Sequence, residues 1–370
     1  MELINYPCAP IYSIKSLARM LGEEAPYLER IASKSNGLYR TVPLLKKDGT
    51  PRETYDAYDQ LKKIQKKIAQ RILNRITYPF YLHGGIRDKI SPRSIYSNSK
   101  VHLGNSFIIL LDVEDFYPSI TSEQVRSVFN NCLGFGDKVS FLLSELLTKD
   151  GRVPQGACTS SHLANLVFWD IEPKVHSHLS DLGFAYSRFA DDITISSKDE
   201  VEAATIGSVV SKVVGMLASK GCRLKRSKFH IRRRGQSLSL KDRAVPLTVT
   251  GLSIFNHLRP TIIQSDRNQI RSAVKKLEVL AHSGCEWSTL EASYNKVMGQ
   301  IGRLIACNHP DGDRLKYRMR VLRAYYDINS SISDNFVTLA KTTFSIDTQP
   351  ITEGSLPPWE EGSFLPPSTR

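Results

Sequence analysis

The stretch Phe107-Ile-Ile-Leu-Leu-Asp-Val-Glu-Asp-Phe-Tyr117 is an apolar run that ends in carboxylates, and Arg188-Phe-Ala-Asp-Asp192 repeats that arrangement further along the chain. The first run predicts a buried strand, because β-branched and aromatic residues dominate it. The segments 185–189 and 193–196 predict the two strands of a short hairpin around Asp191 and Asp192. A charge at the edge of a buried sheet is costly without a partner, so these carboxylates need a cation.

A divalent metal is the natural cation for such a cluster. Phosphoryl transfer to a sugar hydroxyl uses two Mg²⁺ ions roughly 3.5–4 Å apart, bridged by carboxylates from different strands. Asp112 and Asp191 suit the bridging role, and Asp192 would be a weaker or more distant ligand. The carbonyl of Val113 could add one oxygen, since Mg²⁺ accepts carboxylate and carbonyl ligands. The alternative for an Asp-Asp pair alone is an exposed β-turn.

The surrounding pattern predicts an α+β fold, with a split sheet and helices on one of its faces. An Asp-Gly turn between two strand-like segments predicts a hairpin over 38–55, and everything after residue 262 is mostly helical in pattern. The expected helices before that point cover residues 57–77, 121–149, 163–175 and 201–219.

The chain is strongly basic, and this charge indicates the kind of partner that it binds. Its 370 residues carry 50 Lys and Arg against 37 Asp and Glu, a formal net charge of +13. This balance favours a polyanionic partner, nucleic acid above all. The basic side chains of Lys62 and Lys66 lie on the polar side of an expected helix. Arg267, Arg271 and Lys275 recur every four residues, so they would line one face of another helix.

No membrane segment or secretory signal is expected. The longest apolar run, Phe107 to Leu111, is far shorter than the ~20 residues that span a bilayer, and the N-terminus has neither a basic nor an apolar signal region. We therefore predict a cytoplasmic protein without a membrane partner. The six cysteines form no C-x-x-C pair, which is typical of unpaired buried thiols and not of zinc ligands.

Four motifs, in this order, resemble those of reverse transcriptases. They are Asp112 to Ile120, then Pro154-Gln-Gly-Ala157 with Ala164-Asn-Leu166, then Phe189-Ala-Asp-Asp192, and then Gly221 to Lys228. The resemblance covers roughly residues 38–255, and it implies RNA-templated DNA synthesis by a right-hand polymerase with fingers, a split-βαβ palm and a helical thumb. The implied divisions are fingers and N-terminal helices at 1–101, palm at 102–255, thumb at 256–340 and a Pro-rich tail at 341–370.

The same resemblance suggests a role for several residues. Asp112 and Asp191 would bind the catalytic metals with Asp192 beside them, and Tyr117 would be the steric gate that excludes a ribose 2′-OH. Gln155 and Gly156 would face the incoming nucleotide and the template, and Arg52 would hold the triphosphate. Lys228 would be a general acid for pyrophosphate. A core aromatic is the alternative for Tyr117, and binding of backbone phosphates is the alternative for Lys228. Phe189 departs from the Tyr usual at its position, which leaves the ring in place.

Two shorter strings resemble the signatures of retron reverse transcriptases. Asn98-Ser-Lys-Val-His102 is similar to N-A-x-x-H, with Ser99 in place of Ala, and Val249-Thr-Gly-Leu252 is similar to V-T-G. A retron enzyme would bind a cognate structured noncoding RNA, start from an internal guanosine 2′-OH and use dNTPs to make an RNA-linked msDNA. A retron effector protein and a role in defence against phage would accompany it. The expected RNA contacts are Asn98, His102, Lys62, Lys66, Val249, Thr250, Gly251, Arg267, Arg271 and Lys275.

Two other interpretations stay open at the level of sequence. The first is a reverse transcriptase of another bacterial type, related to group II introns, diversity-generating elements or abortive infection. The second is a catalytically quiet RNA-binding scaffold. Substitution of Asp191 and Asp192 by Asn would separate a scaffold from an enzyme, because only an enzyme needs the carboxylates.

Overall fold

The computed structural model describes residues 3–45, 49–88, 90–233, 247–254 and 258–331 of the chain. The chain divides into two compact units, Met1–Arg267 and Asn268–Arg370. Within the described ranges, no helix is both long enough and apolar enough to cross a lipid bilayer.

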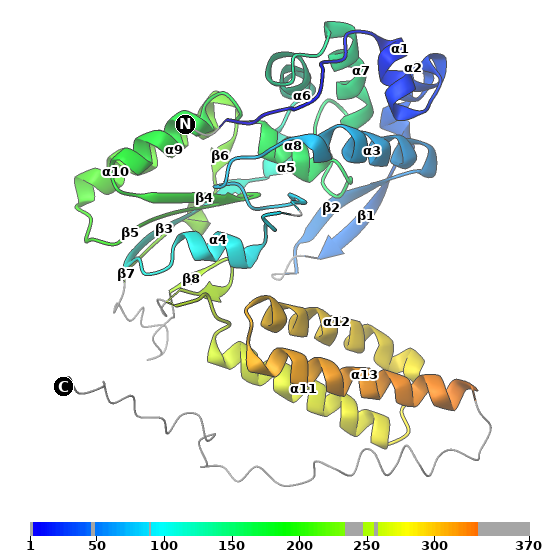
Figure 1. Cartoon of the computed structure of the whole chain (residues 1–370), viewed down its shortest axis with the longest axis vertical. Coiled ribbons are helices and arrows are strands. Elements are labelled where there is room, and N and C mark those ends of the chain that lie inside the picture. The colour runs from blue at the N-terminus through cyan, green and yellow to red at the C-terminus, as the bar shows by residue number, and fades with distance from the viewer. Residues whose placement is uncertain (1–2, 46–48, 89, 234–246, 255–257, 332–370) are drawn as a thin grey trace, which may run out of the picture. The chain divides into compact units, whose positions relative to one another are not determined.

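A five-stranded antiparallel sheet carries the motifs of the first unit (Figure 1). Its strand order is β4 (Ala185–Phe189), β5 (Asp192–Ser197), β3 (Phe107–Glu114) and β6 (Arg223–Leu224). The strand β7 (His230–Arg233) also pairs with β3. The predicted strand and hairpin are therefore confirmed, and the central position of β3 explains why its residues are so apolar.

Both faces of β3 are covered, because alternate side chains of a strand point to opposite sides. Phe107, Ile109 and Leu111 join the main core, to which α9 (Glu172–Asp181) and α10 (Ala203–Ser219) contribute. On the other face, Ile108 packs with Leu247, Val249 and Ile254. These last residues belong to or flank the short strands β8 (Thr248–Val249) and β9 (Leu252–Ser253). The helix α4 (Ile95–Val101) contacts this small hairpin.

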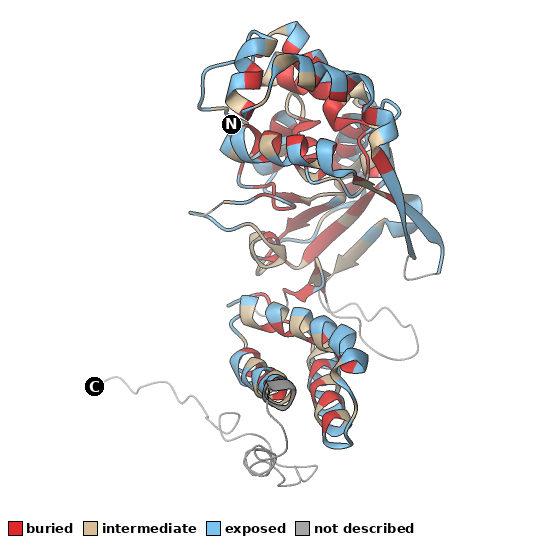
Figure 2. Cartoon of the chain, turned by 90° about the vertical axis from the view of Figure 1, so that its right-hand side faces the viewer, coloured by how far each residue is buried: buried red, intermediate tan, exposed pale blue. Residues whose placement is uncertain are grey.

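The N-terminal part of the first unit is helical around a projecting hairpin. It contains α1 (Ile14–Leu21), α2 (Ala25–Ser33), α3 (Asp59–Arg71), β1 (Tyr39–Leu45) and β2 (Pro51–Ala57), with 3₁₀ turns at Ser35–Leu38 and Leu73–Arg75. Leu61, Ile64 and Ile68 of α3 are fully buried, as the helical period predicts. In contrast, β1 beyond Tyr39 is exposed, and Figure 2 shows the hairpin as a largely pale blue arm.

Two expected helices are interrupted in the structure. In place of one helix over 121–149 there are α6 (Ser122–Ser127), a π-helical turn (Val128–Cys132) and α7 (Asp137–Leu147), and the short helix α5 (Phe116–Ser119) precedes them. The break occurs where Gly134 takes a left-handed φ of +73° and the Asn130 side chain donates to the carbonyl of Phe135. Likewise, 163–175 divides between α8 (Ser160–Leu166) and α9.

In its described residues, up to position 331, the second unit contains three helices, in agreement with the helical pattern predicted after residue 262. They are α11 (Gln264–His282), which starts just before the division between the units, α12 (Trp287–Ala306) and α13 (Pro310–Ser331). Their buried faces carry Val274, Ile301 and Leu315 among others. Ion pairs also hold the helices together, since the Arg318 guanidinium lies 2.5 Å from the Glu278 carboxylate.

Candidate active site

Three carboxylates meet where β3 and β5 run side by side. The strand register places Asp112 directly opposite Asp192. Asp191 lies in the preceding turn, where the N–H of Val113 donates to the Asp191 carbonyl over 3.0 Å. Ala190 adopts a positive φ of +54° in that turn, a conformation that non-glycine residues seldom take. Residues far apart in the sequence are thus placed together by antiparallel pairing.

The electrostatics of this cluster show an excess of negative charge. Loss of solvation, followed by repulsion from Asp191 and Asp112, raises the pKa of Asp192 to about 6. The pKa of Asp191 is also raised, first by burial and then by Asp112. The Lys228 ammonium partly neutralises this charge, because it forms an ion pair with the buried Asp112 carboxylate. The hydrogen bond to Asp112 raises the pKa of Lys228.

The donor set fits a hard divalent cation. Asp112, Asp191 and Asp192 supply only oxygen ligands, and the raised pKa values reflect a charge that a cation would neutralise. In the described residues, no group of three or more His, Cys, Asp or Glu side chains is arranged so that it could hold a metal ion by itself. Such an open carboxylate set is expected where water and substrate oxygens complete the coordination, as they usually do for Mg²⁺.

A recess of about 250 Å³ extends from the carboxylates along the sheet. Asp112, Asp192 and Lys228 line one part of it, while Arg232 and Thr250 line another. The recess therefore runs from the charged cluster to the string Val249-Thr-Gly-Leu252, and it combines acidic groups that attract a metal with basic groups that attract phosphate.

Three of the five residues expected to contact the nucleotide lie close together in the first unit. Arg52 on β2 donates from Nε to Oε1 of Gln155 over 2.9 Å, and the Gln155 carbonyl accepts from the N–H of Tyr55 over 2.7 Å. Gly156 has a φ of +107°, and a Cβ there would lie 2.8 Å from the Tyr55 carbonyl oxygen. This position requires glycine, because the loop passes directly over the backbone of β2.

Tyr117 is partly buried, and it is close enough to Asp191 to feel its charge. Its ring centroid is 6.1 Å from that of Phe116, which is itself in the core. Burial raises the pKa of Tyr117, and the negative charge of Asp191 raises it further. The side chain therefore stays neutral near Asp191, and both a gate and a core aromatic fit this placement. Lys46 and Lys47, which the sequence suggests as possible helpers of Arg52 in holding the triphosphate, lie outside the described residues.

The two retron-like strings contact each other. The Ser99 hydroxyl donates to the carbonyl of Val249 over 2.7 Å, and the Asn98 amide lies 3.5 Å from the Thr250 hydroxyl. His102 is fully buried, with Nδ1 2.7 Å from the Ser196 hydroxyl and Nε2 2.7 Å from that of Ser187. Burial lowers the pKa of His102 to about 3, so its ring is neutral.

This arrangement corrects the expected role of three residues. The side chains of Asn98, His102 and Val249 are buried, so they cannot touch an RNA unless the packing opens. Their polar atoms hold α4 against the sheet and against β8–β9. Thr250 is partly exposed and Gly251 is exposed, so this part of the string faces outward.

The remaining basic residues differ in their surroundings. Lys66 and Lys275 are exposed, whereas the Lys62 ammonium lies 2.6 Å from the Asp56 carboxylate. Arg271 is bound by Asp311 at 2.5 Å, and Arg267 is partly buried. An RNA phosphate would compete with Asp56 for Lys62 and with Asp311 for Arg271.

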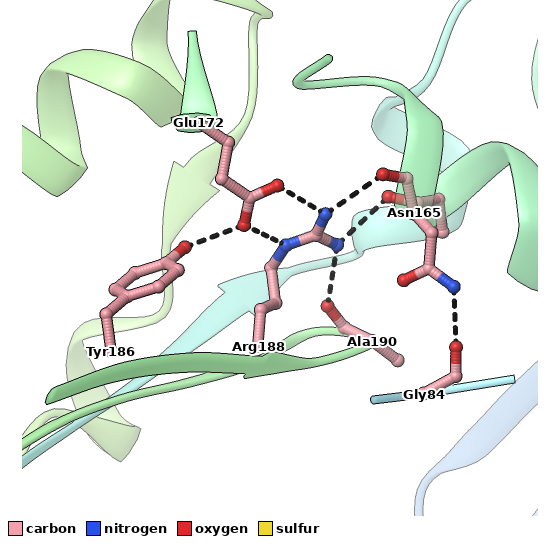
Figure 3. Close-up of polar contacts among 7 residues, drawn as sticks. Gly84, Asn165, Glu172, Tyr186, Arg188 and Ala190 are labelled. Atoms are coloured by element: carbon pink, nitrogen blue, oxygen red, sulfur yellow. Dashed lines mark hydrogen bonds and ion pairs between the residues drawn. The ribbon is translucent and has the colours of Figure 1, made fainter. Parts of the chain in front are cut away.

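One buried ion pair beside the site was not expected from the sequence. Arg188, directly before the Phe189-Ala-Asp-Asp192 motif, is fully buried and bound by Glu172 (Figure 3). Tyr186 donates its hydroxyl to the same carboxylate over 2.7 Å. The sequence feature that could have predicted this ion pair is an arginine within a strand expected to be buried, because a buried charge needs a partner of opposite charge.

Comparison with known proteins now identifies the class. Residues 44–254 match the family model described as reverse transcriptase (RNA-dependent DNA polymerase), which covers the strands and loops that carry the carboxylates. The first unit is accordingly a polymerase palm-type fold, and members of this family generally use divalent metal ions.

The relatives narrow this class. Retron Se72 reverse transcriptase of Salmonella heidelberg (strain 579083-10) is 32% identical over 351 residues, which are 94% of this chain and 88% of the relative. Retron Ec48 reverse transcriptase of Escherichia coli is 26% identical over 325 residues, 85% of this chain and 77% of the relative. Retron Ec86 reverse transcriptase of Escherichia coli is 31% identical over 147 residues, 40% of this chain and 44% of the relative. The chain belongs to the retron reverse transcriptases, and it is an RNA-directed DNA polymerase.

Proposed function

We propose that this enzyme copies part of a cognate structured noncoding RNA into msDNA, starting from an internal guanosine 2′-OH of that RNA. The observation that carries the proposal is the carboxylate cluster, in which Asp112 and Asp192 pair across two strands beside Asp191. The family membership supports the noncoding RNA as template and dNTPs as substrates. We further propose that the enzyme acts in the cytoplasm, in defence against phage, together with a retron effector protein.

The site residues divide the chemistry among them. Two Mg²⁺ ions, held by Asp112, Asp191, Asp192 and the Val113 carbonyl, would lower the pKa of the attacking hydroxyl and neutralise the triphosphate. Arg52 would bind triphosphate oxygens through its guanidinium. Gln155 holds Arg52 in place by a hydrogen bond, and Gly156 lets the loop approach the nucleotide.

Two further side chains act at the ends of the nucleotide. Tyr117 would contact the sugar and exclude a 2′-OH by its ring. Lys228 would donate a proton to the leaving pyrophosphate, and its raised pKa keeps that proton available at neutral pH. In the free enzyme the same ammonium balances the charge of Asp112.

The RNA would lie against basic side chains of both units. The proposed contacts are Lys62, Lys66, Thr250 and Gly251 in the first unit, with Arg267, Arg271 and Lys275 along α11. Structured RNA is recognised largely through its phosphates and shape, which suits exposed lysines and arginines. We propose that the first unit supplies the fingers (1–101) and palm (102–255), and that helices within 256–340 act as the thumb.

Expression of the gene with several hundred bases of upstream DNA tests this function. Total nucleic acid is extracted and examined for a short DNA that changes size after ribonuclease treatment. We expect such a species from the wild type and none from the Asp191→Asn, Asp192→Asn double variant, checked for equal expression. If no RNA-linked DNA forms while purified enzyme still extends a DNA primer on an RNA template, self-priming from a 2′-OH is refuted and the polymerase assignment is kept.

A further inference from the structure

The buried residue Arg188 has all five of its N–H donors satisfied. Nε and Nη2 bind the two oxygens of Glu172 at 2.6 and 2.7 Å. Nη1 donates to the carbonyls of Ala164 and Ala190 at 3.0 and 3.3 Å, and Nη2 also donates to the carbonyl of Asn165 at 3.3 Å (Figure 3). A planar guanidinium has five donors in a fixed fork, so each one here has its own acceptor.

The backbone acceptors of Arg188 belong to two different parts of the proposed site, the Asp191 turn and the helix α8. Ala190 is the residue with positive φ directly before Asp191, so a hydrogen bond to its carbonyl holds the turn that carries Asp191. Ala164 and Asn165 lie in the last turn of α8, whose carbonyls have no partner within the helix. The loop with Gln155 and Gly156 leads into α8, so the position of this helix bears on the proposed nucleotide contacts.

The guanidinium also lies near α5, the short helix that carries Tyr117. It lies 5.8 Å from the ring centroid of Phe116 and 5.3 Å from that of Phe168, and these two rings stack at 5.9 Å. The backbone of Arg188 adds a further link, since its N–H donates to Tyr81 and its carbonyl accepts from His83. The Arg188 side chain therefore contacts three of the four motifs, through Phe116 in the first, Ala164 and Asn165 in the second, and Ala190 in the third.

We propose that Arg188 and Glu172 form a positioning pair that fixes the turn of Asp191 relative to the nucleotide loop on α8. The proposal rests on the proposed function, because it takes Asp191 and Gln155 as site residues. Neither Arg188 nor Glu172 touches substrate in this role. Lysine cannot replace Arg188, since its ammonium has three donors on a flexible stem and cannot reach five acceptors at once. A turn displaced by about 1 Å slows a reaction by up to about 100-fold.

Single-turnover kinetics test this pair without confusing it with folding. Primer extension by one nucleotide on an RNA template gives a burst amplitude, which counts active molecules, and a burst rate, which reports chemistry in those molecules. Arg188→Lys is expected to lower the burst rate by about 10- to 100-fold in the molecules that remain active. A purely structural role would lower the amplitude and leave the rate and the dNTP dependence of that rate unchanged, which would overturn the proposal.

A milder variant covers the case in which Arg188→Lys does not fold. Tyr186→Phe removes one of three hydrogen bonds to Glu172, and we expect a several-fold slower burst at full amplitude. Tyr39→Phe is the matched control, because it also removes a buried tyrosine hydroxyl. That hydroxyl accepts a hydrogen bond of 2.7 Å from the Gln65 amide and does not contact the Asp191 turn. Equal burst rates for Tyr186→Phe and the control would refute the pair. An Asp191→Asn enzyme that still extends primers would instead refute the proposed site.

Discussion

The substitution Gly156→Ala tests the nucleotide loop through a single added methyl group. A Cβ at this position would lie 2.8 Å from the Tyr55 carbonyl, well inside van der Waals contact, and the φ of +107° is strained for any L-residue. A backbone conformation of this kind costs about 1–3 kcal/mol for a non-glycine residue. The loop must relieve that cost by moving away from β2, and Gln155 moves with it.

The loss expected from this movement is in nucleotide binding. Displacement of Gln155 breaks its 2.9 Å hydrogen bond with Arg52, and one such bond to a charged group is worth about 1.5–3 kcal/mol. We therefore expect the KM for dNTP to rise roughly 10- to 100-fold, and kcat to change less, because 1.4 kcal/mol corresponds to about tenfold.

Steady-state primer extension at varied dNTP concentration, with thermal unfolding alongside, measures both effects. Gly207→Ala is the matched control, because a Cβ there meets nothing within 4 Å and lies in the helix α10. The control should keep its KM and unfold slightly later, since alanine favours a helix over glycine by about 1 kcal/mol. A Gly156→Ala enzyme with the KM and Tm of the wild type would refute the reasoning from Cβ contact and φ.

Three more predictions concern other groups of the site and its support. Burial lowers the pKa of His102 to about 3, below the ~6.5 of an unfolded histidine. The neutral buried ring therefore contributes fully to the free energy of unfolding above pH ~6.5, and this contribution is lost as the pH falls toward about 3. Urea unfolding between pH 6 and 4 should show a slope lower by about 1.4 kcal/mol per pH unit in His102→Gln, and an unchanged slope would contradict the burial argument. Lys228→Met should reduce kcat by about 100-fold in primer extension, and an unaltered kcat would exclude Lys228 as proton donor. Tyr117→Ala should raise ribonucleotide incorporation at least about tenfold in competition with dNTP, whereas equal selectivity would indicate a core aromatic.

The palm sheet could be predicted because its signals are local. The run at 107–113 is apolar throughout, and the hairpin around Asp191 alternates in the expected way, so both strands were found from a few residues each. Pairing then follows from the fold, which brings Asp112 opposite Asp192. The helix expected over 121–149 failed at Gly134, where one left-handed residue interrupts an otherwise helical apolar period.

The parts that escaped prediction depend on partners distant in sequence. Polar residues such as Asn98 and His102 suggest a surface when they are read singly, yet both are buried and hydrogen-bond to residues far away in the sequence, Thr250 for Asn98 and Ser187 and Ser196 for His102. Arg188 was missed for the same reason, because Glu172 belongs to a separate helix. Whether a polar side chain is buried depends on its partner elsewhere in the chain, so the local sequence pattern does not predict it.

The contact between Ser99 and Val249 spans 150 residues of sequence, and it has a consequence for how the protein is made. A ribosome adds about 5–20 residues per second, so roughly 8–30 s separate the emergence of α4 from that of its partner hairpin. The central strand β3 also waits for β7 during this time, because Phe107 pairs with Arg233. The nascent palm is therefore an open sheet with one apolar face bare. Codon usage or chaperone supply between residues 100 and 250 should then influence the yield of active enzyme more than the same change would after residue 260.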